Sequence, residues 1–274
     1  MNGRIDVEVT RTSEVRRGPV VTASLLGGCR IRVGGHVVDT TSSRQTRGLL
    51  AYLLVHRRAR IPRDVLMDVF WPHAAPAAAR NCLHVALTRV RAALRAADGE
   101  ALLERNFDTY GISRDADVRL DVDQFEAASA LARRASTAGD ALRAEQAYGA
   151  TCQLYAGAFL ADDPYLEWTL SLRERLAREA IEAQRGLMHI YLRRGDHGAA
   201  AVLARSVLAV DPADEEVNRG LMACLASSGQ RHLALEQYQR MARTLWRTYR
   251  IGPSAESTAL YEAIRNPGPY RSRP

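Results

Sequence analysis

The chain has 274 residues, 47% of them hydrophobic, and a formal net charge of +7 at pH 7. This length can bury one large or two ordinary hydrophobic cores, and we expect two domains. The longest strongly apolar run, residues 49–55, is far too short to cross a bilayer, and the first residues contain no apolar stretch of signal-peptide length. The composition therefore excludes an integral membrane protein and predicts a soluble, cytoplasmic protein with no membrane partner.

The sequence lacks the usual signatures of metal binding and catalysis. Its cysteines are widely spaced, and none lies in a CxxC motif or at zinc-finger distance from a histidine, which predicts reduced thiols and no metal site. No glycine-rich phosphate loop, GxSxG or HExxH motif occurs. We therefore expect neither an enzyme nor a bound cofactor. The cysteines are Cys29, Cys82, Cys152 and Cys224.

Positive charge is concentrated in the first part of the chain. Residues 1–120 hold 19 arginines against 12 acidic residues, whereas residues 121–274 hold 19 of each. Residues 30–95 hold 12 arginines against three aspartates. Every basic side chain is an arginine, whose planar guanidinium suits paired contacts to phosphate or guanine. This distribution predicts a polyanionic partner for the first part of the chain.

A small sheet is the first predicted element. Residues 1–19 are polar, and we expect a flexible segment there. Two Gly-Gly pairs within residues 20–39 separate short β-branched runs, a pattern typical of a small antiparallel sheet.

Three helices and a hairpin are predicted next. Thr41, Ser42 or Ser43 can cap the first helix, and Pro72 ends the second. An order of sheet, three helices and hairpin is typical of a winged helix, an α/β domain in which the hairpin is the wing. The elements are a helix over 44–56, an extended link over 60–62, helices over 63–71 and 77–95, and hairpin strands over 101–105 and 109–113 around a turn at 106–108.

The third of these helices is amphipathic. One stripe is aliphatic, formed by Leu83, Ala86, Leu87, Val90 and Leu94. The opposite face carries Asn81, His84, Val85, Thr88 and Ala92, flanked by Arg80, Arg89, Arg91 and Arg95. A buried aliphatic back and an exposed front of arginine, amide, hydroxyl and methyl groups are what a helix needs to enter a DNA major groove.

From about residue 121 the apolar pattern is helical throughout. Gly195 and Gly229 lie 34 residues apart, and each is followed five residues later by an alanine. Gly139 and Ala144 repeat the local pattern at another distance. This spacing favours tetratricopeptide-like helix pairs. Helices are predicted over 121–136, 138–155, 164–193, 196–209, 214–228, 231–248 and 255–265. Tyr165 and Trp168 recur at helical spacing beside leucines, and we expect them in the core.

Several runs resemble the Streptomyces antibiotic regulatory protein family. WPHAAPAAARNCLHVALTRVRAALR (71–95) is similar to the recognition-helix region of that family, whose DNA-binding domain resembles that of OmpR-type response regulators. DDPYLEWTLSLRERL (162–176), NRGLMACLASSGQRHLALEQYQRMARTL (218–245) and GPSAESTALYEAIR (252–265) resemble the bacterial transcriptional activator domain. The resemblance implies an OmpR-like winged helix over 20–118, an all-helical activator domain over 119–266 and a flexible tail over 267–274.

The family resemblance implies a transcriptional activator, usually of an antibiotic or other secondary-metabolite gene cluster. Such a protein binds double-stranded DNA at direct repeats, as a tandem dimer, and contacts RNA polymerase holoenzyme. Two stretches depart from the family pattern. The wing reads NFDTYGIS where many relatives have a Gly-Gly turn and basic residues, which puts its minor-groove contact in question. Arg250, Ile251 and Gly252 replace a more usual approach to the final Pro-Ser.

The predicted site residues fall into three groups. Arg89 suits a bidentate contact to guanine and Asn81 one to adenine, while Val85 can either meet a thymine methyl or lie covered by the wing. Arg44, Arg47 and Arg63 stand at helix starts, where phosphate also binds, or are solvated surface charges. The base-facing residues are Asn81, His84, Val85, Thr88 and Arg89; those facing phosphate are Arg44, Arg47, Arg63, Trp71, Arg80, Arg91 and Arg95; those of the wing are Arg105, Asn106 and Thr109.

Two other classes of protein compete with the activator hypothesis. The first is a scaffold whose helical repeats bind a protein and whose basic domain is a nonspecific nucleic-acid anchor. The second is a hydrolase or transferase with a helical accessory domain, which no catalytic constellation supports. A promoter footprint separates activator from scaffold, because a scaffold leaves no protected direct repeat.

Overall fold

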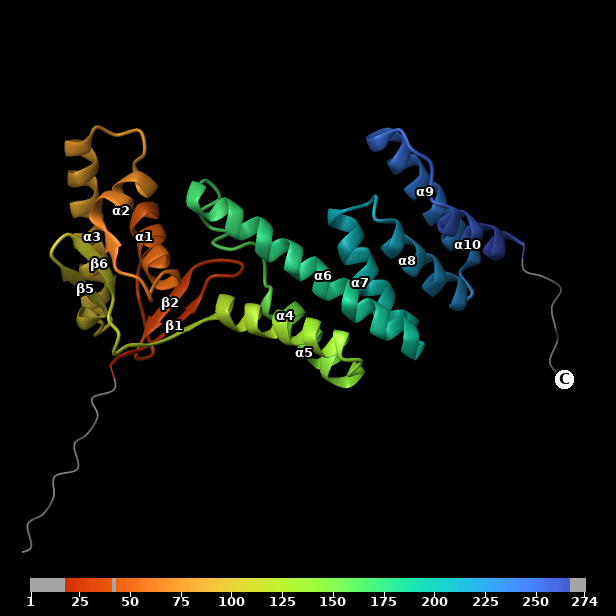
Figure 1. Cartoon of the computed structure of the whole chain (residues 1–274), viewed down its shortest axis with the longest axis horizontal. Helices are drawn as coiled ribbons and strands as arrows, with labels where there is room; N and C mark the ends of the chain where they lie inside the picture. Colours follow the sequence, from red (N-terminus) through yellow and green to blue (C-terminus); the bar gives the residue numbers. More distant parts are fainter. Residues whose placement is uncertain (1–17, 41–42, 267–274) are drawn as a thin grey trace, which may run out of the picture. The chain divides into compact units, whose positions relative to one another are not determined.

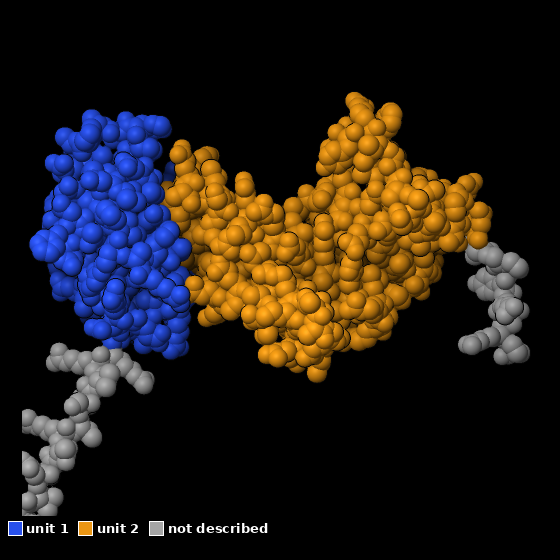
Figure 2. Space-filling view, viewed as in Figure 1, with its two compact units in different colours: residues 1–24, 29–120 blue, residues 25–28, 121–274 orange. Residues whose placement is uncertain are grey.

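The structure is a computed structural model that describes residues 18–40 and 43–266. Its chain divides into two compact units, coloured separately in Figure 2. Among the described residues, unit 1 contains those up to Ser24 and from Cys29 to Leu120, and unit 2 contains Leu25–Gly28 and those from Asp121 onward. The fold is mostly helical with a small β region near the N-terminus, as predicted. Of the flexible segment expected over 1–19, residues 1–17 lie outside the described residues, as does the whole of the tail expected over 267–274.

Unit 1 begins with a four-stranded sheet in the order β3-β2-β1-β7. Its first three strands are antiparallel, and alternate residues such as Val21, Ile31 and Val33 are buried. The fourth strand, β7, pairs in parallel with β1. The sequence did not predict β7, because its four residues are mostly polar and its partner is almost a hundred residues away. The strands are β1 (Val20–Ser24), β2 (Arg30–Val33), β3 (His36–Val37) and β7 (Asp117–Leu120).

The three predicted helices and the wing follow in unit 1 (Figure 1). Of the candidate caps, Ser43 is described, and its side chain accepts a hydrogen bond from the Thr46 backbone N–H. The second sheet, in the order β4-β6-β5, joins the wing hairpin to the link before α2. The elements are α1 (Arg44–Val55), β4 (Ile61–Pro62), α2 (Arg63–Phe70), α3 (Pro76–Ala96), η1 (Glu100–Leu102), β5 (Leu103–Asn106) and β6 (Thr109–Ile112).

Unit 2 is a row of helices in which each packs against the next (Figure 1). Its core is built from small and aliphatic side chains such as Ala200, Met188 and Met222, which are fully buried. The helices are α4 (Asp121–Thr137), α5 (Ala141–Leu154), η2 (Glu167–Thr169), α6 (Leu170–Arg194), α7 (His197–Val210), α8 (Glu215–Ser227), α9 (Arg231–Tyr249) and α10 (Ala255–Arg265).

The glycine and alanine pattern marks equivalent turns in three helix pairs. Each glycine adopts a left-handed conformation, with φ of 75°, 78° and 75° in chain order. At each turn the glycine N–H donates to the carbonyl three residues back, and the next N–H donates to the carbonyl five residues back. Each following alanine is buried where helices cross. The pattern therefore ends one helix and starts the next in the same way at Gly139, Gly195 and Gly229, with Ala144, Ala200 and Ala234.

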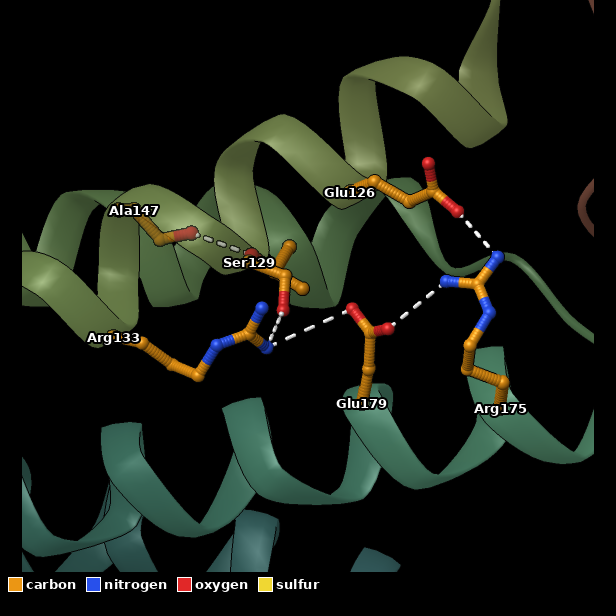
Figure 3. Close-up of polar contacts among 7 residues, drawn as sticks. Glu126, Ser129, Arg133, Ala147, Arg175 and Glu179 are labelled. Atoms are coloured by element: carbon orange, nitrogen blue, oxygen red, sulfur yellow. Dashed lines mark hydrogen bonds and ion pairs between the residues drawn. The ribbon is translucent and has the colours of Figure 1, made fainter.

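An ion-pair chain crosses from α4 to α6 in unit 2 (Figure 3). Arg175 donates to Glu126 at 2.6 Å and to Glu179 at 3.1 Å. The other Glu179 oxygen lies 3.7 Å from Arg133, which also donates to the Ser129 hydroxyl at 2.8 Å. Because these side chains are mostly half-exposed, each pair contributes less than ~1 kcal/mol. The network shows that the positive charge of this surface is neutralised within the unit.

The loop between α5 and α6 is held by one arginine. Arg173 donates to the backbone carbonyls of Phe159, Leu160, Asp163 and Pro164 at 2.7–2.8 Å. The first three of these residues have 0% exposure. The Leu160 and Asp163 carbonyls also accept from the Asp163 and Leu166 N–H groups, so Arg173 matters most for the buried Phe159 carbonyl. Consequently the predicted helix over 164–193 begins only at residue 170, because its first residues form this loop.

Tyr165 and Trp168, near this loop, were both expected in the core, and the prediction was wrong for Tyr165. Tyr165 is 78% exposed, because residue 165 lies in the loop and not on a helix face. Trp168 is half-buried, with its ring edge against Phe159 at a centroid distance of 5.7 Å.

The short segment Leu25–Gly28 belongs to unit 2 although the predicted sheet included it. Asp121 accepts hydrogen bonds from the Leu25 and Leu26 N–H groups at 2.8 and 2.9 Å, and Leu26 also bridges to Phe159. Burial raises the pKa of Asp121 against the opposing effect of these hydrogen bonds. The helical domain was expected to begin at residue 119. The long segment of unit 2 begins at Asp121, and unit 2 also includes the four residues Leu25–Gly28 from far upstream.

Candidate nucleic-acid interface

Helix α3 has the buried stripe that its sequence predicts. Pro76 stands at the first helical position, where its fixed φ and missing N–H cost nothing. The expected aliphatic residues are all buried, together with Ala79, at the three- and four-residue spacing of one helix face. The buried residues are Ala79, Leu83, Ala86, Leu87, Val90 and Leu94. This stripe docks α3 on unit 1 and turns its other face outward.

The outward face of α3 carries the residues predicted to face bases. All five are exposed: Asn81, His84, Val85, Thr88 and Arg89. Val85 is 40% exposed, so the wing does not cover it. The Thr88 hydroxyl donates to the His84 carbonyl at 2.9 Å, which leaves its oxygen able to accept a bond. The face therefore offers donors, acceptors and a methyl group on one rigid helix.

The arginines of α3 remain largely uncompensated. The helix contains no acidic residue. Among the described residues, no carboxylate pairs with Arg80, Arg89 or Arg91, although Arg91 is half-buried. Arg95 donates to Glu100 at 2.8 and 3.1 Å, so part of its charge is shared. The field at this face is positive, which attracts a polyanion.

A hollow of about 230 Å³ runs along one side of α3. It separates the helix from the start of α1 and from the half-buried Trp71, whose ring lies 5.8 Å from that of Phe70. The lining residues include Ser43, Gln45, Trp71, Asn81, Val85 and Arg89. Arg44 and Arg47, which were predicted to face phosphate, lie in the first turn of α1, next in sequence to or near the lining residues Ser43 and Gln45.

A second hollow, of about 360 Å³, lies on the other side of α3, toward the wing. It brings together residues from three elements that the sequence predicted separately: Arg63 of α2, Arg80, Asn81 and His84 of α3, and Arg105 and Tyr110 of the wing. Asn81 lines both hollows, which places it at the centre of the candidate interface.

The wing is a hairpin of β5 and β6 with Phe107 and Asp108 at its tip. Asn106 pairs with Thr109, so the turn has two residues where three were predicted. The Thr109 hydroxyl donates to the Asn106 carbonyl at 2.8 Å, and Arg105 Nε donates to the Phe107 carbonyl at 2.9 Å. The three predicted wing residues therefore shape the turn itself.

Arg63 joins α2 to the wing. Its backbone N–H donates to the Asp108 carbonyl at 2.7 Å, and its guanidinium lies 3.1 Å from the Asp108 carboxylate and 3.4 Å from Asp64. The side chain is 27% exposed. Its charge is thus partly compensated within unit 1, a pairing that sequence could not indicate because 45 residues separate the partners.

Three further residues belong to the candidate interface and were not predicted. Gln45 and Tyr110 line the two hollows, and Phe107 stands at the wing tip with 90% exposure. Only Phe107 left a sequence signal, an aromatic residue inside a polar turn. Within the described ranges, no group of three His, Cys, Asp or Glu side chains is placed to hold a metal ion, and no helix is both long and apolar enough to span a membrane.

Comparison with known families bears on the helical half. The family model of the bacterial transcriptional activator domain matches residues 120–265. The chain belongs to this family. The match begins within one residue of the start of the main part of unit 2, and it confirms the resemblance to Streptomyces antibiotic regulatory proteins.

Curated relatives are similar over most of the chain. Regulatory protein AfsR of Streptomyces griseus is 25% identical over 99% of this chain, which spans 27% of AfsR. Transcriptional regulatory protein MoaR1 of Mycobacterium tuberculosis is 23% identical over 89% of this chain and 79% of MoaR1. Regulatory protein DnrI of Streptomyces peucetius is 25% identical over 86% of this chain and 89% of DnrI. These relatives are regulators by name.

A solved structure shares the fold. Mycobacterium tuberculosis EmbR, in a complex with a low-affinity phosphopeptide, superposes with a TM-score of 0.74 at 22% identity. The similarity covers 92% of this chain and 66% of the EmbR chain.

Proposed function

We propose that the chain is a sequence-specific DNA-binding activator of transcription. The observation that carries the proposal is the exposed front of α3, on which an amide, a hydroxyl, a methyl-bearing side chain and unpaired guanidinium groups share one face without any carboxylate. The family and the named regulators among its relatives support the same function. Phosphate contacts alone bind any duplex, so the base-facing side chains are what confers specificity.

Within this function the residues have distinct roles. Arg89 forms a bidentate contact to guanine and Asn81 to adenine, each worth ~1–3 kcal/mol of discrimination. Arg80, Arg91 and the first turn of α1 hold phosphates on either side of α3. If about six phosphates are neutralised, affinity falls roughly a thousandfold between about 50 and about 200 mM salt.

The proposed targets are direct repeats near a promoter of a secondary-metabolite gene cluster. Two copies of the chain bind side by side in the same orientation, about one helical turn or ~10–11 bp apart. Unit 2 then contacts RNA polymerase holoenzyme, a role that its family membership supports.

Footprinting on the promoters beside the chain's own gene tests the proposal. We expect two protected segments of the same orientation at helical spacing, and more transcript when the chain is added to polymerase holoenzyme on that template. A matched template with one repeat scrambled should lose both effects. Uniform binding without a protected repeat would contradict the proposal and favour the helical scaffold with a nonspecific nucleic-acid anchor.

A further inference from the structure

Phe107 stands out on the surface of unit 1. Its side chain is 90% exposed, more than any other large hydrophobic residue in the described part of the chain. Within that part its ring makes no aromatic or cation contact with another side chain. Folding of the wing therefore buries little of the ring.

The backbone of Phe107 adds a cost to this exposure. Its φ is +48°, in the left-handed region that asparagine and glycine adopt more readily than an aromatic residue. A bulky residue kept in an unfavourable conformation, with its ring in solvent, is better explained by binding than by stability.

The charged groups beside Phe107 are already engaged. Asp108 pairs with Arg63 at 3.1 Å, and Arg105 donates to the Phe107 carbonyl while its guanidinium lies 5.9 Å from the centre of the Tyr110 ring. The tip of the wing therefore exposes a neutral aromatic ring, while the charged side chains beside it are engaged in contacts within unit 1.

The base of the same hairpin lines the hollow beside α3. Arg105 and Tyr110 line it together with Arg63, Arg80 and His84, so the wing and the proposed recognition helix border one hollow that is rich in arginine. A duplex read by α3 is the partner whose charge fits this lining, and Phe107 lies two residues beyond Arg105 in the turn of the same hairpin.

We propose that Phe107 is an apolar wedge that enters the minor groove and partly unstacks one base step of the DNA bound by α3. The inference rests on the proposed function and extends it. Apolar side chains inserted in this way open flexible pyrimidine–purine steps more easily than stiff ones. The operator should therefore prefer such a step under the wing, at a position that no hydrogen bond reads.

The first test compares Phe107→Asn and Phe107→Leu with the wild-type chain, all full length. The probe is a labelled duplex that the wild-type chain selects from a random library, titrated at several salt concentrations. We expect Phe107→Asn to bind about tenfold more weakly with an unchanged salt slope, because an apolar contact releases no counterions. Phe107→Leu should stay within about twofold of wild type. Arg80→Ala is the contrasting control, with a slope reduced by about one.

Two further measurements support the test. Asparagine adopts this φ at a lower conformational cost than phenylalanine, so Phe107→Asn should melt at the wild-type temperature or above. This measurement separates lost binding from lost folding. With 2-aminopurine placed at successive positions of the probe, the wild-type chain should brighten one step under the wing, and Phe107→Asn should not.

Three results would overturn the wedge. One is wild-type affinity for Phe107→Asn, and another is a weaker complex with a shallower salt slope. The third is a loss confined to the second copy on a two-repeat probe, which would assign Phe107 to contact between copies. In each case the selected duplex still shows specific binding, so the proposed function stands; failure of the wild-type chain to select any sequence would instead remove the proposed function.

Discussion

Helices α3 and α6 are both long, amphipathic and rich in arginine, yet their arginines have different partners. On α6, Arg175 pairs with two glutamates, Arg194 pairs with Glu145, and Arg173 holds backbone carbonyls. On α3, Arg80, Arg89 and Arg91 have no carboxylate partner within the described residues, whereas Arg95 shares its charge with Glu100. The same side chain is thus structural where acids surround it and available for a polyanion where they are absent, which is the physical meaning of the uneven charge distribution along the sequence.

The largest effect is expected from Arg173→Ala, which removes an arginine of α6 that has a structural role. Four charged hydrogen bonds to carbonyls are lost, and the Leu160 and Asp163 carbonyls keep a backbone donor each, so we expect the free energy of unfolding of unit 2 to fall by ~3 kcal/mol. Thermal denaturation measures the change, with Arg173→Lys as the matched control that keeps the charge but not the forked geometry. A wild-type melting curve for Arg173→Ala would show that the loop does not depend on this residue.

Arg89→Ala tests an arginine of α3 that is proposed to bind DNA. It should weaken the selected duplex by ~1–3 kcal/mol while sparing random duplex, because a base contact and not a phosphate contact is lost. Arg178→Ala, an exposed arginine of α6, is the matched control and should change neither titration. Equal losses on the two duplexes would remove Arg89 from the base-reading residues.

Glu215→Gln probes pH dependence in unit 2. Burial raises the pKa of Glu215, but hydrogen bonds from Ser257 and Ser254 outweigh it, so the pKa lies below 4.5. A lowered pKa stabilises the fold above that usual value, and the effect is lost as pH falls through the folded pKa.

The expected destabilisation by Glu215→Gln is ~1 kcal/mol near pH 7, shrinking below about pH 4.5. Glu216→Gln is the control on the same helix, because that side chain is 53% exposed. A destabilisation that stays constant across this pH range would refute the charge-dependent role of Glu215.

The smallest effect is expected from Asp108→Asn, which should increase the difference in uncompensated positive charge between unit 1 and unit 2. Removing this carboxylate releases Arg63 and one repulsive charge at the wing tip. Binding to any duplex should tighten about threefold, with a salt slope steeper by up to about one. Unchanged binding in the same titrations would mean that Arg63 does not reach phosphate even when released.

Local patterns account for the parts of this molecule that the sequence predicted well. The buried stripe of α3 and the exposure of Asn81 and Arg89 follow from helical periodicity alone. The glycine and alanine spacing marked the turns of unit 2 because a left-handed cap and a close helix crossing each restrict one residue type.

What the sequence determined by itself is therefore which faces of the helices are apolar and where the uncompensated charge lies, since both depend on neighbours within a few turns. Tertiary structure alone decided the pairing of β7 with β1, the transfer of Leu25–Gly28 to unit 2 and the contact between Arg63 and Asp108. Each joins residues about 45 to 130 positions apart, so its partner is chosen by chain topology and not by any local pattern. The same topology leaves Phe107 alone at the tip of the wing.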